Sequence, residues 1–178
     1  MKKIVSAGII LLMITICINS LFFQQEKSVN TVKSTIEPNQ LSKHAVPNQK
    51  LITLNNKEMT LYDNLGKPTI LVFWASWCIP CNEELPEIQN FYSEYKDSVN
   101  VVTINATDTE LNIKSLTKYL DDKNWTFPIF IDEKGDIRKT FGAFTVPTTV
   151  FLSADGELVH DVYGPIDTNY IIEILSTI

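Results

Sequence analysis

The sequence predicts an α/β domain in which a mixed central β-sheet carries helices on both faces. Apolar, β-rich runs at 68–76 and 100–107 are bounded by turn residues, which is typical of strands buried on both faces. A segment with helical periodicity follows each run, so strand and helix alternate and these strands are expected to pair in parallel. The chain has 178 residues, 44% of them apolar, which is enough for one packed domain plus an appendage.

The first expected element is a β-hairpin at 50–63, which turns at Asn55-Asn56. After the strand at 68–76, apolar residues recur at helical spacing over 78–96 and predict an amphipathic helix. Its inner face is expected to contain Cys81, Leu85, Ile88, Tyr92 and Tyr95.

A second helix is expected over 108–123, beyond the run at 100–107, with Asp108 or Thr109 as its cap. Its expected inner face consists of Leu111, Leu116 and Leu120. A short strand at 128–132 and a short helical or turn segment at 135–143 follow.

Residues 148–163 predict two strands joined through Asp155-Gly156, and a last helix begins at Asp167 or Thr168. This late hairpin adds antiparallel strands to the parallel ones, which is why the sheet is expected to be mixed.

The N-terminus predicts a membrane anchor. Two lysines precede an uncharged run at 4–23, which is about the length of a membrane-spanning helix. The lysines favour a cytoplasmic N-terminus, so the rest of the chain is expected to be exported. A cleaved signal peptide is the alternative, although no clear small-residue cleavage site follows the run. Residues 1–23 are therefore assigned as a signal-anchor, polar residues 24–47 as a tether, and 48–178 as the folded domain.

Composition excludes several classes of function. The formal net charge is −6 and there is no basic stripe, which argues against nucleic-acid binding. No glycine-rich dinucleotide loop is present, so no nicotinamide, flavin or other cofactor is expected.

The stretch FWASWCIPCNEELP at 73–86 carries the chemistry. Cys78 is expected to open the helix after a buried strand, where free N–H groups and the helix dipole favour a thiolate. Cys81, one turn along, is placed to attack a mixed disulfide formed at Cys78. Because a bridge over so short a loop removes little chain entropy, the pair is better suited to redox exchange than to stabilising the fold.

Metal binding is the rival interpretation of the paired cysteines. A structural zinc site needs about four ligands, and the chain offers one pair plus two histidines. His44 lies in the tether and His160 on an expected strand, so no metal is expected here.

The motifs FWASWCIPC, LPEI and TVPTT resemble those of the thioredoxin superfamily. The pattern WCxPCxxExP, the anchor and the extra elements at 100–131 resemble the TlpA/ResA-like group, membrane-anchored extracytoplasmic thiol-disulfide oxidoreductases. The resemblance implies a thioredoxin-like fold with an N-terminal β-hairpin and a TlpA/ResA-type central insertion. It also implies a redox-active disulfide between Cys78 and Cys81.

The resemblance further implies roles for four residues. Glu84 would move a proton to or from Cys81; the alternative is a solvated surface glutamate. Trp77 would form a wall of the site. Val146 and Pro147, joined by a cis peptide bond, would bind the client chain beside the disulfide.

The implied activity is reduction of disulfides in exported client proteins, for example apocytochrome c or envelope or sporulation proteins, with electrons from a membrane thiol donor. An oxidase or isomerase using the same residues is the enzymatic alternative. A metal-binding module that uses the two cysteines is the non-enzymatic alternative.

Overall fold

The computed structural model describes residues 45–178. The predicted anchor, most of the tether and His44 lie outside the described residues. The described strands are β1 (Lys50–Thr53), β2 (Glu58–Thr60), β3 (Thr69–Trp74), β4 (Asn100–Asn105), β5 (Ile129–Ile131), β6 (Thr148–Leu152) and β7 (Leu158–Tyr163). The described helices are α2 (Ile79–Tyr95), α3 (Ile113–Asp121), α4 (Asp136–Thr140) and α5 (Thr168–Leu175), with 3₁₀ turns η1 (Leu61–Asn64) and η2 (Thr107–Thr109).

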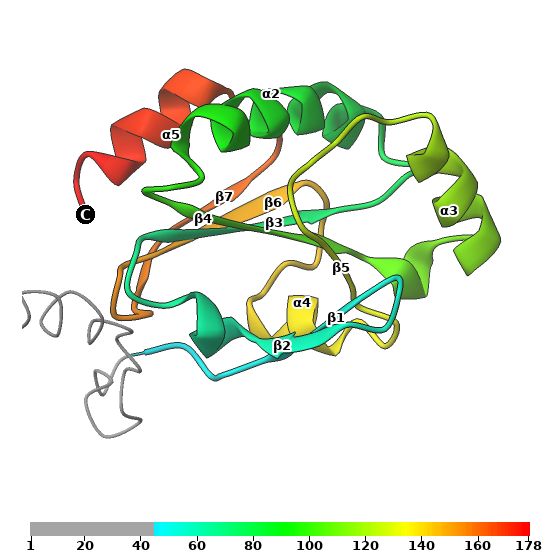
Figure 1. Ribbon diagram of the computed structural model, residues 1–178, viewed down its shortest axis with the longest axis horizontal. Helices are drawn as coiled ribbons and strands as arrows, with labels where there is room; N and C mark the ends of the chain where they lie inside the picture. Colours follow the sequence, from blue (N-terminus) through cyan, green and yellow to red (C-terminus); the bar gives the residue numbers. More distant parts are fainter. Residues whose placement is uncertain (1–44) are drawn as a thin grey trace, which may run out of the picture. The chain divides into compact units, whose positions relative to one another are not determined.

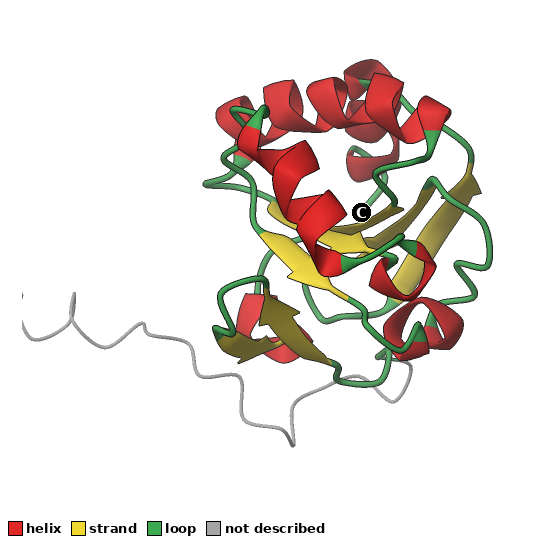
Figure 2. Ribbon diagram, turned by 90° about the vertical axis from the view of Figure 1, so that its right-hand side faces the viewer, coloured by secondary structure: helices red, strands yellow, loops and turns green. Residues whose placement is uncertain are grey.

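The strands form one mixed sheet in the order β2-β1-β5-β4-β3-β6-β7. Figure 2 shows the strands in yellow and the helices in red. The two strand–helix–strand units make β3, β4 and β5 parallel, as the alternation predicts. Both predicted hairpins are present, since β1 pairs with β2 and β6 with β7 in antiparallel fashion. The first hairpin turns where expected, with Asn56 in the left-handed region at a φ of 58°.

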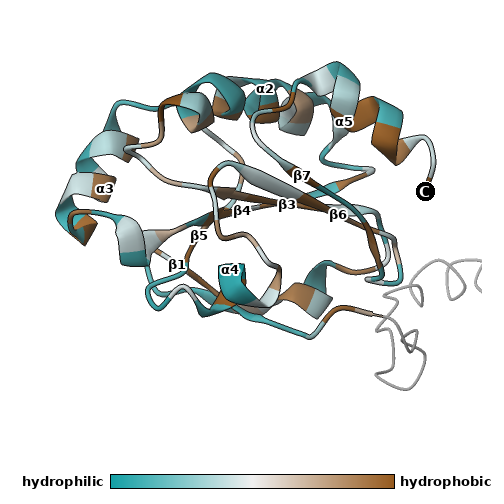
Figure 3. Cartoon of the chain, turned by 180° about the vertical axis from the view of Figure 1, so that it is seen from behind, coloured by the Kyte–Doolittle hydropathy of each residue, from teal (hydrophilic) through white to brown (hydrophobic). Residues whose placement is uncertain are grey.

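Helices lie on both sides of the sheet (Figure 1), and each face of the sheet carries one apolar cluster. Ile70, Val72 and Trp74 of β3 belong to the cluster that contains the inner residues of α2, α3 and α5. Leu71 and Phe73 of the same strand belong to the cluster on the other face, with side chains from η1 and α4. All six residues of β3 are therefore buried, and the hydropathy colouring shows an apolar sheet interior beneath helices with polar outer faces (Figure 3).

The inner face of α2 was predicted only in part. Cys81, Leu85 and Ile88 are buried as expected, but Phe91 and Glu84 are buried as well. The predicted tyrosines, Tyr92 and Tyr95, are half-buried at the border of the cluster.

The single helix expected over 108–123 is wrong in its first half. The chain makes the short turn η2, extends at Glu110, and starts α3 only at Ile113. Asn112 caps α3, because its side-chain Oδ1 accepts the N–H of Ser115 at 2.9 Å. The expected cap Asp108 is instead paired with Arg138 at 2.6 Å.

The expected inner face of this helix changes with its start. Leu116 is fully buried and Leu120 packs against the core, as predicted. Leu111 lies before the helix and is 85% exposed, so its assignment to the inner face is wrong.

Between residues 45 and 178, no helix has the length and apolar character needed to cross a bilayer.

Alanine substitutions at two leucines test the corrected start of α3. Leu116→Ala should lower the free energy of unfolding by about 2–5 kcal/mol, because it leaves a cavity in a buried cluster. Leu111→Ala removes the same atoms from an exposed site and should change it by less than about 0.5 kcal/mol. Urea unfolding of both variants gives the comparison, and equal losses would contradict the helix start seen here.

Candidate active site

The site forms where β3 ends and α2 begins. After Trp74 the chain turns, with the N–H of Cys78 donating to the carbonyl of Ala75 at 3.2 Å. Cys78 is extended and is the N-cap of α2. Its Sγ accepts the N–H of Cys81 at 3.2 Å, so one of the free donors of the first turn points at this sulfur. Pro80 occupies the first turn of the helix, where its missing N–H costs little.

The two cysteines are joined by a disulfide. Cys81 is completely buried, whereas Cys78 retains a small exposed area at the surface. An attacking sulfur from another chain therefore reaches Cys78 before Cys81.

The loop before β6 lies against this disulfide. The peptide bond between Val146 and Pro147 is cis, and the carbonyl oxygen of Val146 is 3.5 Å from Cys78 Sγ. Residues from opposite halves of the chain thus meet at the Cys78 sulfur.

Glu84 is buried on the same side of α2 as Cys81, with only 1% of its surface exposed. Its Oε1 accepts the N–H of Ile166 and the hydroxyl of Thr149, each at 3.3 Å, while Oε2 has no partner. Burial raises the pKa of Glu84 to about 7, against the opposing effect of these two hydrogen bonds. The alternative of a solvated surface glutamate is therefore wrong for Glu84, although the neighbouring Glu83 is exposed.

The two tryptophans of the motif differ in environment. Trp77 is 57% exposed beside Cys78, and its Nε1 donates to Thr109 Oγ1 at 3.2 Å. Trp74 is fully buried and packs edge-on against Trp125, with ring centroids 5.8 Å apart. Trp77 thus lies at the surface, and Trp74 belongs to the core.

Two exposed apolar side chains near the sulfur were not anticipated. Ile79, next to Cys78, is 75% exposed, and Phe144, two residues before Val146, is 71% exposed. Trp77 and Ile79 flank Cys78 in the sequence, and Phe144 belongs to the loop before β6. Exposed apolar side chains therefore come from both segments that meet at the sulfur. Hydrophobicity alone does not reveal them, because their exposure depends on how the two loops are brought together.

Asn82 was also missed. Its Nδ2 donates to the carbonyl oxygens of Cys78, at 2.7 Å, and Ser76, at 3.3 Å. Its Oδ1 accepts the hydroxyl of Tyr119 on α3. One amide thereby connects the cysteine loop to the segment inserted between β4 and β5.

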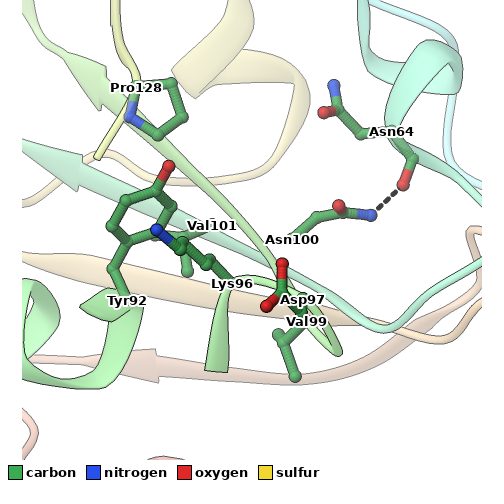
Figure 4. A pocket seen from close by; sticks show the side chains of 8 residues that line it. All are labelled: Asn64, Tyr92, Lys96, Asp97, Val99, Asn100, Val101 and Pro128. Carbon is green, nitrogen blue, oxygen red and sulfur yellow. Dashed lines mark hydrogen bonds between the residues drawn. The ribbon is translucent and has the colours of Figure 1, made fainter. Parts of the chain in front are cut away.

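Other features of the described residues lie away from this chemistry. The pocket lined by Tyr92, Lys96 and Asn100 (Figure 4) is near the start of β4, whereas the cysteines follow the opposite end of the parallel neighbour β3. His160 is half-buried on β7, as expected, with its Nε2 3.1 Å from the hydroxyl of Tyr170. No group of three or more metal-ligating side chains is found from residue 45 onward.

Comparison with known proteins places the chain among thiol-disulfide oxidoreductases. Residues 43–161 match the AhpC/TSA family. Sporulation thiol-disulfide oxidoreductase A of Bacillus subtilis is 38% identical over 122 residues, 68% of this chain and 74% of that protein. Thiol-disulfide oxidoreductase ResA of Bacillus thuringiensis is 34% identical over 119 residues, 66% of this chain and 67% of that protein.

The crystal structure of StoA from Bacillus subtilis has the same fold. It superimposes with a TM-score of 0.66 at 33% identity, covering 74% of this chain and 98% of that one. The predicted thioredoxin-like fold is confirmed, and so is the resemblance to the ResA-like group.

Burial of Glu84 predicts a pH dependence of stability in the oxidised protein. Its pKa rises from 4.5 to about 7, so between these values the folded protein binds more protons than the unfolded chain. The free energy of unfolding should therefore fall as pH rises through this window, by up to about 3 kcal/mol. Glu84→Gln should remove this loss.

Urea unfolding below pH 4.5 and above pH 7 measures the difference. Glu83→Gln is the matched control, since it changes an exposed carboxyl one residue away and should keep the wild-type dependence. If Glu84→Gln kept the same dependence as wild type, the raised pKa would be refuted.

Proposed function

The chain belongs to the AhpC/TSA family and is a thiol-disulfide oxidoreductase, and we propose that it reduces disulfides in exported client proteins. The observation that carries the proposal is the placement of Cys78 at the N-cap of α2, bonded to Cys81 and 3.5 Å from the Val146 carbonyl. The domain acts on the extracytoplasmic side of a membrane, anchored by residues 4–23. Clients of the kind expected are apocytochrome c or envelope and sporulation proteins.

Reduction proceeds through two exchanges. The Cys78 thiolate attacks one sulfur of the client disulfide, forming a Cys78–client bond and releasing the other client sulfur as a thiolate that takes up a proton. Cys81 then loses its proton and attacks Cys78, which forms the Cys78–Cys81 disulfide and releases the second client thiol. Two electrons pass to the client, and a membrane thiol donor restores the dithiol.

Glu84 is the proposed proton acceptor for Cys81. Both side chains are buried on one side of α2, three residues apart, where water has little access. A pKa of about 7 lets this carboxyl both take and return a proton near neutral pH.

Client binding is proposed at the Val146–Pro147 loop and Trp77. An extended client segment can pair with the backbone of Val146 as an added strand, while Pro147 has no N–H to leave unsatisfied. The exposed rings of Trp77 and Phe144 and the side chain of Ile79 contribute apolar contact around the target cysteine.

The reduction potential of the Cys78–Cys81 pair tests the direction of electron flow. We expect a value near or below about −250 mV, in the range of thioredoxin. Equilibration of the full-length chain with defined thiol buffers gives the number. A value near about −120 mV would identify a disulfide donor and overturn the proposed reductase.

Trapping of mixed disulfides tests which proteins are the clients. Cys81→Ser should accumulate mixed disulfides with exported proteins, because the resolving sulfur is gone, whereas Cys78→Ser should accumulate none. Non-reducing electrophoresis of whole cells, followed by mass spectrometry, identifies the partners.

Substitution of Glu84 tests its role in proton transfer. Glu84→Gln should slow disulfide exchange by about 100-fold, which is the lower end of the contribution of general acid–base catalysis. It should also lower the apparent pKa of one of the two active-site cysteines. Stopped-flow exchange with a disulfide peptide across a range of pH gives both quantities, with Glu83→Gln as control. Unchanged rates at every pH would remove Glu84 from the mechanism.

A further inference from the structure

Glu110 connects the central insertion to the loop that carries the nucleophile. Its Oε1 accepts the N–H of Ser76 at 2.7 Å and the Nδ2 of Asn105 at 2.8 Å. Its Oε2 accepts the hydroxyl of Ser76. Asn105 is fully buried at the end of β4, so its bond fixes the carboxylate relative to the sheet. The same carboxylate binds the main chain at Ser76, two residues before Cys78.

The rest of this segment holds the same loop. Thr109, the residue before Glu110, accepts the indole N–H of Trp77. Tyr119 on α3 donates to Asn82, whose amide in turn donates to the carbonyl of Cys78 at 2.7 Å. The inserted residues therefore bind the loop from Ser76 to Cys78 by several hydrogen bonds.

The charge of Glu110 is not neutralised by a cation. Over residues 45–178 the ion pairs are Lys50–Glu58, Arg138–Asp108 and Lys139–Asp136, and none includes Glu110. Its hydrogen-bond partners, which are the N–H and hydroxyl of Ser76 and the amide of Asn105, are all neutral donors. The charge acts on its surroundings, since burial and Glu110 together raise the pKa of Tyr119 to about 12.

We propose that Glu110 is a positioning residue that fixes the loop from Ser76 to Cys78 and whose negative charge disfavours the Cys78 thiolate, opposing the effect of the α2 N-terminus. Consecutive Cα atoms are about 3.8 Å apart, so Ser76 and Cys78 lie within about 8 Å of each other. The Glu110 carboxylate, bonded to the Ser76 N–H at 2.7 Å, is therefore roughly 10 Å from Cys78, which is about one Debye length at moderate salt. The inference rests on the proposed dithiol chemistry.

Other ionisable groups next to the cysteines do not supply this effect. Glu84 on α2 is buried and can be neutral near pH 7 because its pKa is raised. Asp108 is paired with Arg138, and the Tyr119 hydroxyl stays protonated. Glu83 is exposed to solvent, which screens its charge.

The size of the effect follows from Coulomb's law. Two unit charges about 10 Å apart, at an effective dielectric constant between about 20 and 80, shift a pKa by roughly 0.3 to 1 unit. Loss of the charge at Glu110 should lower the pKa of Cys78 by this amount. The reduced form then gains stability only where the thiolate is populated, so the pair becomes more oxidising above the Cys78 pKa and unchanged well below it.

Glu110→Gln is the decisive variant, because glutamine keeps an acceptor for Ser76 and Asn105 but has no charge. In the reduced full-length chain, the pH dependence of Cys78 alkylation, followed by mass spectrometry of its peptide, gives the pKa. The matched control is Glu94→Gln, which removes an exposed carboxylate about 24 Å away along α2 and should have no effect. An unchanged or raised Cys78 pKa in Glu110→Gln would overturn the electrostatic part of the proposal.

Two further variants separate charge from position. Ser76→Ala keeps the carboxylate and the Ser76 N–H bond, so the Cys78 pKa should stay within error of wild type; a shift equal to that of Glu110→Gln would overturn the proposal. Glu110→Ala loses charge and hydrogen bonds together, and should slow exchange at least about threefold beyond Glu110→Gln at matched thiolate fraction. Equal rates for these two would overturn the positioning role.

The potential gives an independent reading. Above the Cys78 pKa, each unit of lowered pKa should change the equilibrium with a reference dithiol by up to tenfold, or about 30 mV. None of these measurements needs a client. A wild-type chain that exchanges with no protein disulfide would refute the proposed function, whereas a variant with wild-type pKa and potential would refute only the role of Glu110.

Discussion

The hydrogen bond from the Cys81 N–H to Cys78 Sγ is the contact on which the site depends, because it puts the reactive sulfur at the positive end of α2. That contact is available only if the helix starts immediately after the sulfur, and the helix starts there because β3 delivers the chain to that point. β3 is buried on both faces and is hydrogen-bonded to β4 on one side and to β6 on the other, which fixes the position of its end in the sheet. The position of the reactive sulfur is thus fixed by a strand whose residues are all buried.

The packing of α2 on the sheet that positions the sulfur also buries Glu84 and raises its pKa. A carboxyl on the inner face of α2 is enclosed by β6, through Thr149, and by the segment before α5, through Ile166. Two neutral donors on one oxygen do not replace full hydration, and the second oxygen has no partner. The fold therefore gives up stability near neutral pH for a group that can exchange a proton in a water-poor site. An apolar residue would pack better there, and a surface carboxyl would keep an ordinary pKa.

Much of this was accessible from the sequence, for reasons that are local. The strand at 68–76, the helix after it and both hairpins are encoded by short-range periodicity and turn residues, and all are present. The CxxC at a strand-to-helix junction predicts where chemistry should occur. The features that could not be predicted depend on contacts between distant segments. Burial of Glu84, for example, depends on Thr149 and Ile166, which are 65 and 82 positions further along the chain. The exposure of Phe144 and Ile79 is likewise decided by which loops meet, and periodicity carries no information on that.

The one wrong helix shows how a local rule yields to a distant contact. Residues 108–123 have helical spacing, yet the chain is extended at Glu110 and the helix begins anew after Asn112. A helix running through Glu110 would direct its side chain by the helical repeat, whereas the extended backbone lets the carboxylate reach Ser76 and Asn105. Three hydrogen bonds to the carboxylate, together with the cap at Asn112, offset the lost turn of helix. The hydrogen bonds of Glu110 therefore explain both why the helix starts late and how the cysteine loop is held. A conflict of this kind, between local helical preference and the observed structure, is expected at functional segments.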